Sequence, residues 1–564
     1  MHYIKEILQK NKFTMLAHVL TGICLAFLTC FKADFFQDVI DSLTAGTLTP
    51  GSVVIYGILL FSCYLLGYLE EWPWKKLENG IYLDFKLMAL KKISSIDYSA
   101  YCRLGTGKPV QRIENGAAAG RNVIVNFWLR LIRELVPSVL FSIFFIWRIN
   151  RTITYVLLIG YLFVFLITNL LLKFLYRIKE KILNNEEQLN HYLVRGFMEM
   201  LVFRTHRQFP GELRKADRAR REIVSTKVKM NMIHESFFTI FAILVGLLEI
   251  IIVVYAWKTG SLSVGSVVAL ITLIGNAYTP IAIFNVIYVQ YKLDKTACGR
   301  LVEFLEGTDD PQLEEGRQTE LKGGITVKNL SFRYEERQIL DGLSLTVRPG
   351  EKVAFVGESG CGKSTLAKLL MGLLKYESGS ILLDGTELKE LCLNDLYGKV
   401  SYLSQDAPVF DGTLRENLIF DRDIPDDALE EGLRRVQLTQ LLHTAPAGMD
   451  TQIGERDTLL SGGEKQRLAL ARLWFEDPRI VILDEATSAM DNLTEECVME
   501  EVVRKLEGRT VIAIAHRLKS VAGFDRILVF REGRIVAQGT FDALLKENAY
   551  FADLYHASAA GNVR

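Results

Sequence analysis

Six long apolar stretches dominate the first half of the chain and restrict most strongly how it can fold. They occupy residues 13–33, 51–69, 127–147, 152–176, 236–257 and 264–290. Each approaches or exceeds the ~20 residues that a membrane-spanning helix requires. A core helix of a soluble protein can be equally apolar, but six such stretches in succession favour a membrane domain. We therefore predict that residues 13–300 form six spanning helices in a lipid bilayer.

The distribution of basic residues predicts how these helices are oriented. Lys and Arg are frequent between the second and third stretches and between the fourth and fifth, whereas residues 33–51 contain neither. Because basic loops tend to stay on the cytoplasmic side, both termini and both long connections are predicted to be cytoplasmic. Arg148 and Arg151 oppose this rule, but they lie in a tight turn that has little influence on topology.

The N-terminus and the overall composition indicate where the protein is located and which partners are disfavoured. Ile4, Ile7 and Leu8 share one face of a possible helix, so residues 1–12 are predicted to form an elbow helix at the membrane surface. The length of the chain and the lack of an organelle signal indicate a bacterial plasma membrane. With 66 basic and 66 acidic residues, the charge balance gives no support for nucleic-acid binding. The eight cysteines form no CxxC pair and are expected to be reduced or membrane-buried thiols.

The character of the chain changes near Leu301. Residues 306–324 are polar and Gly-rich, and a linker is predicted over 301–324. Over residues 325–558 apolar strand-like runs alternate with helical patterns, which is typical of an α/β domain with a largely parallel sheet. Residues 559–564 are taken as a tail.

A glycine-rich loop lies between a predicted strand and a predicted helix in this second half. The residues concerned are Gly357, Glu358, Ser359, Gly360, Cys361, Gly362, Lys363, Ser364 and Thr365. They fit the phosphate-loop pattern, in which glycines let backbone N–H groups surround phosphate oxygens. The following helix directs its positive end at the same phosphates. Lys363 can then reach the β- and γ-phosphates, and Ser364 can ligate Mg²⁺. A chance glycine-rich turn is disfavoured by the strand and helix on either side.

Several polar residues that follow predicted strands are candidates for the associated chemistry. Asp484 and Glu485 end a buried strand; Asp484 can hold Mg²⁺, and Glu485 can polarise an attacking water. A capping pair of acids is the alternative. Gln405 can meet the metal or the water, and His516 can contact the γ-phosphate, although such residues are often structural. Tyr334 can stack on an adenine ring or belong to the core.

A second possible anion site lies at the start of another predicted helix. Ser461, Gly462, Gly463 and Glu464 precede the helical run from Lys465 to Phe475. Helix N-termini with permissive glycines bind phosphate, but the same residues can simply cap the helix.

The order and spacing of these motifs resemble the ATP-binding cassette (ABC) family. The resemblance implies that 357–364 is the Walker A loop, 461–464 part of the signature motif and 488–491 the D-loop. It also implies that Gln405 is the Q-loop residue, Asp484 the Walker B aspartate, Glu485 the catalytic glutamate, His516 the switch histidine and Tyr334 the A-loop aromatic. ATP and Mg²⁺ are the implied cofactors. Two positions depart mildly from the common pattern, since Glu464 replaces Gln and Met490 replaces Leu.

The layout of six spans followed by one cassette is similar to an exporter-type half-transporter. The resemblance implies two chains, identical or different, that sandwich ATP between the phosphate loop of one and the 461–464 site of the other. It also implies short coupling helices near 111–119 and 195–206. The expected activity is ATP-driven transport, most concretely export. A metal–chelate importer, a lipid flippase and a non-transporting regulatory ATPase remain alternatives.

The transported substrate is not indicated by the sequence. Glu249 in the fifth apolar stretch, together with Asn276 and Asn285 in the sixth, are candidates for the substrate path, because polar groups inside a bilayer tend to be functional. Arg130, Arg133 and Glu134 are further polar groups near the third stretch, and all of these can equally bond to each other within the bundle.

Overall fold

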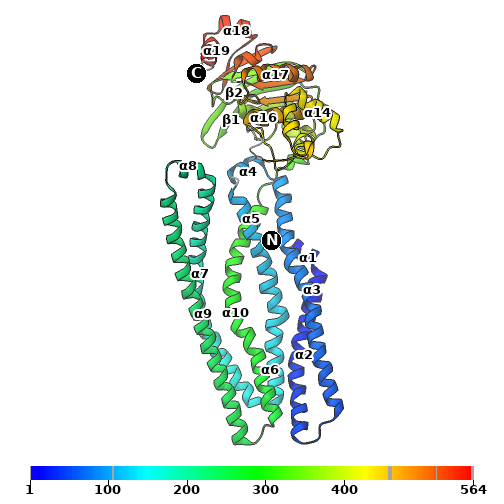
Figure 1. The fold of residues 1–564 in the computed structure, drawn as a ribbon, viewed down its shortest axis with the longest axis vertical. Coiled ribbons are helices and arrows are strands. Elements are labelled where there is room, and N and C mark those ends of the chain that lie inside the picture. Colours follow the sequence, from blue (N-terminus) through cyan, green and yellow to red (C-terminus); the bar gives the residue numbers. More distant parts are fainter. Residues whose placement is uncertain (1, 105–106, 455–459, 516, 561–564) are drawn as a thin grey trace. The chain divides into compact units, whose positions relative to one another are not determined.

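The computed structural model describes residues 2–104, 107–454, 460–515 and 517–560, and the chain divides into two compact units (Figure 1). The first unit comprises Met1–Ser94 and Leu104–Gly307, and the second comprises Ser95–Arg103 and Thr308–Arg564. The division after Gly307 falls within the stretch 301–324 that the sequence predicts as a linker. Helix α10 continues through the first residues of that stretch, to Leu305.

The first unit is helical throughout its described residues. Its elements are α1 (His2–Lys10), α2 (Lys12–Thr44), α3 (Pro50–Ser95), α5 (Gly107–Arg121), η1 (Asn122–Leu129), η2 (Leu131–Leu135), α6 (Val136–Ile149), α7 (Arg151–Met198), α8 (Met200–Thr205), α9 (Phe209–Thr259) and α10 (Val264–Leu305). The elements η1 and η2 are π-helices. Such segments are rare and are often found at functional sites.

Among the described residues, four helices, α2, α3, α9 and α10, are long and apolar enough to cross a membrane, and they coincide with four of the six predicted spans. The predicted third span, 127–147, falls on η1, η2 and α6, so the π-helical stretches divide it. The fourth, 152–176, falls on α7, where the side chains of 163–175 lie outside the described residues.

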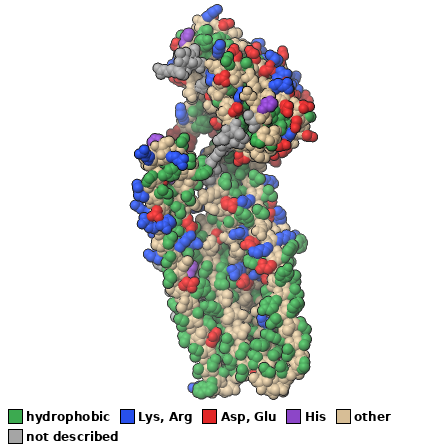
Figure 2. All heavy atoms as spheres, in the orientation of Figure 1, with side chains coloured by type: hydrophobic (Ala, Val, Ile, Leu, Met, Phe, Trp, Pro, Cys, Tyr) green, Lys and Arg blue, Asp and Glu red, His purple; other side chains and the backbone are tan. Residues whose placement is uncertain are grey.

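The packing of this unit leaves a broad apolar surface. Helix α10 contacts α2, α5 and α6, and α7 runs beside α9 (Figure 1). Large apolar side chains point outwards; Phe61 is 66% exposed and Trp257 is 85% exposed. Figure 2 shows hydrophobic side chains over much of the visible face of these helices. An outward apolar face of this extent is expected where the surrounding medium is lipid.

The second unit is an α/β domain. Its strands are β1 (Ile325–Tyr334), β2 (Arg337–Val347), β3 (Lys352–Gly357), β4 (Ser378–Leu383), β5 (Thr386–Glu387), β6 (Val400–Leu403), β7 (Gly412–Thr413), β8 (Gln452–Ile453), β9 (Ile480–Asp484), β10 (Thr510–Ile514), β11 (Arg526–Arg531) and β12 (Arg534–Gly539). The longer helices are α11 (Lys363–Leu370), α14 (Asp426–Arg435), α16 (Gly462–Ala471), α17 (Asn492–Lys505) and α19 (Ala549–Ala560).

The strands form two main sheets. The six-stranded sheet has the order β12-β11-β3-β10-β9-β6, with β12 antiparallel at one edge and the other neighbours parallel. The second sheet, β2-β1-β4-β5, is antiparallel. Both faces of β3, β9 and β10 are buried, as their unbroken apolar sequences require. The carboxyl ends of these parallel strands lie at one edge of the sheet, which is where α/β domains bind ligands.

A short helix inserted between α3 and α5 belongs to this second unit. Helix α4 (Tyr98–Leu104) follows Asp97, whose carboxylate accepts a hydrogen bond from Ala100 N at 3.0 Å. The backbone of Asp310 donates to the Ser95 carbonyl at 2.8 Å, and Tyr98 packs against the apolar core of the α/β domain. The sequence places a short helix near 111–119, but the structure has it at Tyr98–Leu104, and 111–119 lies inside α5.

Candidate nucleotide-binding site

The phosphate loop connects the buried strand β3 to helix α11. Gly357, Gly360 and Gly362 have φ angles of +152°, +82° and +104°, a region that favours glycine. A Cβ on Gly357 would lie 2.2 Å from the carbonyl oxygen of Phe530 on the neighbouring strand β11. The loop therefore needs glycine for two reasons, its backbone angles and its close approach to β11.

Lys363 is the first residue of α11, and its side chain folds back into the loop. Its ammonium donates to the carbonyl oxygens of Gly357 at 2.8 Å and Glu358 at 2.9 Å. The residue is only 4% exposed. A buried cation beside a curled backbone and a helix N-terminus is a strong environment for a phosphate.

The end of strand β9 brings a carboxylate next to the loop. Ser364 Oγ donates to Asp484 Oδ1 at 2.9 Å, and Tyr402 Oη donates to Asp484 Oδ2 at 3.0 Å. Among the described residues there is no cluster of three or more His, Cys, Asp or Glu that could hold a metal by itself. Mg²⁺ commonly uses one or two protein oxygens together with phosphate oxygens, so the hydroxyl of Ser364 and the carboxylate of Asp484 fit that ion.

Glu485 lies immediately after Asp484 and contacts Gln405. Gln405 Nε2 donates to Glu485 Oε2 at 2.8 Å. Because the amide nitrogen is bonded to Glu485, the amide oxygen of Gln405 is the atom that could ligate a metal. Glu485 has a φ of +53°, an unusual value for a residue other than glycine. Strained backbone of this kind concentrates at functional sites, where the surrounding structure holds it in place. The structure thus brings Gln405, Asp484 and Glu485 together beside Ser364.

Tyr334 and His516 are the remaining candidates, and the structure describes only the first. Tyr334, at the end of β1, is 44% exposed, packs edge-on against Phe332 and is hydrogen-bonded to Thr365. Its exposed ring is available for stacking beside the loop. Partial burial raises the pKa of Tyr334, so its hydroxyl stays protonated at neutral pH. His516 lies outside the described residues.

The second predicted anion site forms a capped helix start. Ser461 Oγ accepts from Glu464 N at 3.3 Å, while Glu464 Oε2 accepts from Ser461 N at 2.8 Å. This reciprocal pair is a capping box for α16, as the alternative interpretation of the sequence anticipates. Within the described residues, no hydrogen bond or ion pair joins 461–464 to the phosphate loop of the same chain. A role in binding ATP therefore remains a prediction.

Two buried polar residues that sequence reasoning missed tie the motifs to each other. Gln466 donates to Ser488 Oγ at 3.0 Å and accepts from Ala489 N at 2.8 Å, which joins α16 to the 488–491 segment. Glu495 accepts from Thr487 at 2.8 Å and pairs with Arg517 at 2.5 Å. Neither residue lies in a sequence motif, and their partners are 8–23 residues away along the chain.

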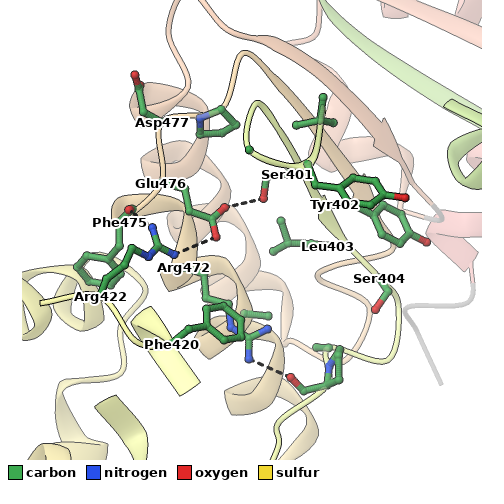
Figure 3. Close-up of a pocket in the computed structure, with 17 residues that line it drawn as sticks. Ser401, Tyr402, Leu403, Ser404, Phe420, Arg422, Arg472, Phe475, Glu476 and Asp477 are labelled. Atoms are coloured by element: carbon green, nitrogen blue, oxygen red, sulfur yellow. Dashed lines mark hydrogen bonds and ion pairs between the residues drawn. The ribbon is translucent and has the colours of Figure 1, made fainter. Parts of the chain in front are cut away.

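A cavity of about 450 Å³ opens beside strand β6 (Figure 3). On one wall, Glu476 accepts a hydrogen bond from Ser401 at 2.9 Å and pairs with Arg422 at 3.5 Å. The lining also includes Arg472, which donates to the Pro408 carbonyl at 3.0 Å. Tyr402 also lines this cavity, so one residue contacts both the cavity and Asp484.

The helical unit contains an ionic cluster whose partners the sequence did not reveal. Arg133 of η2 forms an ion pair with Glu70 of α3 and lies 3.4 Å from Nε2 of His18 of α2. His18 and Glu70 are only 2% and 6% exposed. Gly22 makes room for this arrangement, because a Cβ there would lie 2.0 Å from the Arg133 side chain. The cluster joins three helices that are far apart in the sequence.

The predicted substrate-path residues are not brought together by any contact in the described part of the chain. Glu249 on α9 is partly buried. Asn276 on α10 has a buried amide nitrogen with no hydrogen-bond partner in the structure. The side chain of Asn285 lies outside the described residues.

Comparisons with known proteins agree with this geometry. Residues 340–488 match the family model described as ABC transporter. An uncharacterized ABC transporter ATP-binding protein, YwjA, of Bacillus subtilis is 36% identical over 57% of this chain and 55% of its own length. An ATP-dependent lipid A-core flippase of Pseudomonas fluorescens is 37% identical over 54% of this chain and 52% of its own. The chain thus matches these curated relatives over about half of their length.

A solved structure extends the likeness to the whole fold. The structure of a bacterial Atm1-family ABC exporter with ATP bound has a TM-score of 0.82, covers 98% of this chain and is 24% identical. The phosphate loop and the neighbouring carboxylates lie inside the matched residues 340–488, and the helices that precede them include several long and apolar enough to cross a membrane. The chain therefore carries an ABC transporter domain over residues 340–488 and has the fold of that exporter structure.

Proposed function

We propose that the chain hydrolyses ATP to move a substrate across a membrane, with export as the direction. The observation that supports this proposal is the set of contacts at the end of β9, where Ser364 of the phosphate loop bonds to the carboxylate of Asp484 and Gln405 bonds to Glu485. Spanning-length apolar helices in the same chain favour transport over a purely regulatory ATPase.

The residues of the site divide the work of hydrolysis. Lys363 and the loop amides hold the β- and γ-phosphates, and bound Mg²⁺ would neutralise charge on the phosphate oxygens beside Ser364 and Asp484. Glu485 polarises the attacking water, and Gln405, hydrogen-bonded to it, orients its carboxylate. His516 is proposed to contact the γ-phosphate.

We further propose that two chains are needed to complete each ATP site. Support comes from Ser461–Glu464, which form a second helix N-terminus and, in the described part of the chain, make no hydrogen bond or ion pair to the phosphate loop. In a head-to-tail pair, ATP on one loop would meet the helix start of the partner and join the two cassettes. Both a homodimer and a heterodimer satisfy this arrangement.

Short helices are proposed to carry closure of the cassettes to the membrane. Helix α4 interrupts the path from α3 to α5, yet it packs with the cassette. Any displacement of the cassette around Tyr98 therefore acts on two long helices through the covalent chain. Helix α8, which ends α7 with an exposed apolar surface that includes Leu201 (71% exposed), is the candidate for the second contact of this kind.

The relatives support one particular substrate class as a second candidate. Several of them are named as lipid A-core flippases, so movement of a lipid between leaflets is a specific form of the proposed transport. Import of a metal–chelate complex and non-transporting ATP hydrolysis are the remaining alternatives.

The proposal is tested with the full chain in liposomes. A fluorescently labelled phospholipid and a soluble cationic dye are compared as cargo, with wild type and Glu485→Gln side by side. ATP-dependent movement of either probe by wild type alone supports transport, and the probe that moves indicates the substrate class. Native mass spectrometry of the variant with ATP tests the two-chain arrangement. The regulatory alternative would be favoured if the wild-type protein hydrolysed ATP but moved neither probe, and if neither probe stimulated its ATP hydrolysis.

A further inference from the structure

Tyr402 occupies an unusual place, between the cavity beside β6 and the carboxylate of Asp484. It lies on β6, which pairs with β9 in parallel, and the register places Tyr402 opposite Ile482. From there its hydroxyl reaches Asp484 Oδ2 at 3.0 Å. The bond joins residues 82 positions apart in the sequence and lies inside the cassette.

The two oxygens of Asp484 have different donors. Ser364 donates to Oδ1 at 2.9 Å, and Tyr402 donates to Oδ2. Asp484 is 4% exposed, and within the described ranges the structure shows no ion pair to it. Two neutral hydroxyls therefore hold a buried carboxylate, and the orientation of its Oδ1 towards Ser364 depends on the bond at Oδ2.

The state of the Tyr402 hydroxyl suits this role. A tyrosine hydroxyl is a neutral donor, and the structure directs this one at Oδ2 of Asp484 at 3.0 Å. The hydrogen bond from a neutral donor to an ionised carboxylate is also stronger than one between neutral groups. Among the described residues, both oxygens of Asp484 are thus held by neutral hydroxyls, from Ser364 and Tyr402.

The ring of Tyr402 links this bond to other parts of the cassette. It lines the cavity shown in Figure 3. It also packs against the same apolar core as Tyr98 of α4. A change in how the residues of the cavity or helix α4 pack would therefore reach Tyr402. The hydroxyl of this side chain is bonded directly to Asp484.

We propose that Tyr402 is a positioning residue that orients Asp484 for Mg²⁺ and makes the strength of metal binding sensitive to the packing around the cavity. The inference rests on the proposed ATP hydrolysis, because it assigns Mg²⁺·ATP to the site beside Asp484.

The test compares Tyr402→Phe with Tyr397→Phe in the full chain. Both variants remove one hydroxyl from a tyrosine that lines the same cavity, but the structure gives the Tyr397 hydroxyl no bond to Asp484. Three quantities are measured: the affinity for a fluorescent ATP analogue without metal, the affinity for Mn²⁺ from its paramagnetic resonance signal with a non-hydrolysable ATP analogue, and the Mg²⁺ dependence of ATP hydrolysis.

For Tyr402→Phe we expect unchanged metal-free nucleotide affinity, and roughly tenfold weaker Mn²⁺ and Mg²⁺ binding, because a hydrogen bond to a charged group is lost. Tyr397→Phe should match wild type in all three. Wild-type metal affinity in Tyr402→Phe would overturn the inference, as would an equal loss of metal-free nucleotide binding, which would indicate a general structural role. Failure of the wild-type protein itself to hydrolyse ATP would instead refute the proposed function.

Discussion

Replacing Gly357 with alanine tests whether the phosphate loop is held by its packing against strand β11. The added Cβ would lie 2.2 Å from the Phe530 carbonyl oxygen and 3.1 Å from Cys361 Sγ. That carbonyl belongs to a buried strand paired in register with β3, so it cannot rotate away as a flexible side chain could. Gly360 is a matched control, because its Cβ would meet no protein atom within 4 Å.

The expected magnitudes differ for the two positions. Gly360→Ala carries mainly the cost of its positive φ, about 1–2 kcal/mol, which corresponds to roughly 5- to 30-fold weaker ATP binding. Gly357→Ala adds an overpacking cost of about 1–3 kcal/mol, so a total of about 2–5 kcal/mol is expected. Its ATP affinity should fall by roughly 30-fold or more, because the Gly357 carbonyl also holds Lys363.

The assay measures both thermal unfolding without nucleotide and the affinity for a fluorescent ATP analogue. Gly357→Ala should lower the unfolding temperature and the affinity together, whereas Gly360→Ala should lower the affinity with a smaller change in unfolding temperature. Wild-type unfolding and ATP binding by Gly357→Ala, or a lower unfolding temperature for Gly360→Ala than for Gly357→Ala, would show that packing against β11 does not hold the loop.

Three further changes probe other contacts. Glu464→Gln removes a negative charge from the helix start proposed to face ATP, and it should lower the KM for ATP a few-fold; a raised KM would contradict the proposed role. Glu495→Gln breaks a buried ion pair with Arg517, and we expect kcat to fall at least tenfold in steady-state ATPase assays. An unchanged kcat would contradict this expectation. Glu70→Gln leaves the Arg133 charge without its ion-pair partner on α3, so the unfolding temperature in detergent should drop, and the double change with Arg133→Met should restore much of it. A double variant no more stable than the single one would show that the ion pair is not the cause.

The sequence predicts the cassette well because its motifs are local. A strand, a glycine-rich loop and a helix follow one another over 352–370, so periodicity and turn chemistry suffice to place Lys363 and Ser364. The parallel order of strands then brings the end of β9, with Asp484, to the same edge. The positions of Lys363, Ser364 and Asp484 therefore follow from local sequence patterns and from the general geometry of α/β sheets.

What the sequence could not supply depends on tertiary contacts. Tyr402 lies within a strand pattern, and only the pairing of β6 with β9 reveals its bond to Asp484. The same holds for His18 and Glu70, whose partner Arg133 lies on a third helix. The π-helical turns of η1 and η2 have no clear signal in hydropathy, because their apolar composition equals that of an α-helix.

The short helix predicted near 111–119 shows an error that local signals could have prevented. The prediction places a short helix near 111–119. In the structure those residues lie inside α5, and the short helix α4 starts after Asp97, a residue type that caps helix N-termini. Treating Asp97 as a helix N-cap would have placed the short helix at the position found in the structure.

Steady-state ATP hydrolysis by Glu485→Gln, measured beside wild type in the same lipid, tests the central claim most directly. Glu485 touches Gln405 and lies at the end of the strand that carries Asp484, so it is assigned to activate the attacking water. General-base catalysis contributes typically about 10²–10⁴-fold. The account predicts that the variant binds ATP like wild type but hydrolyses it at least 100-fold more slowly, by roughly that estimate. Hydrolysis at the wild-type rate would contradict the assignment of the site.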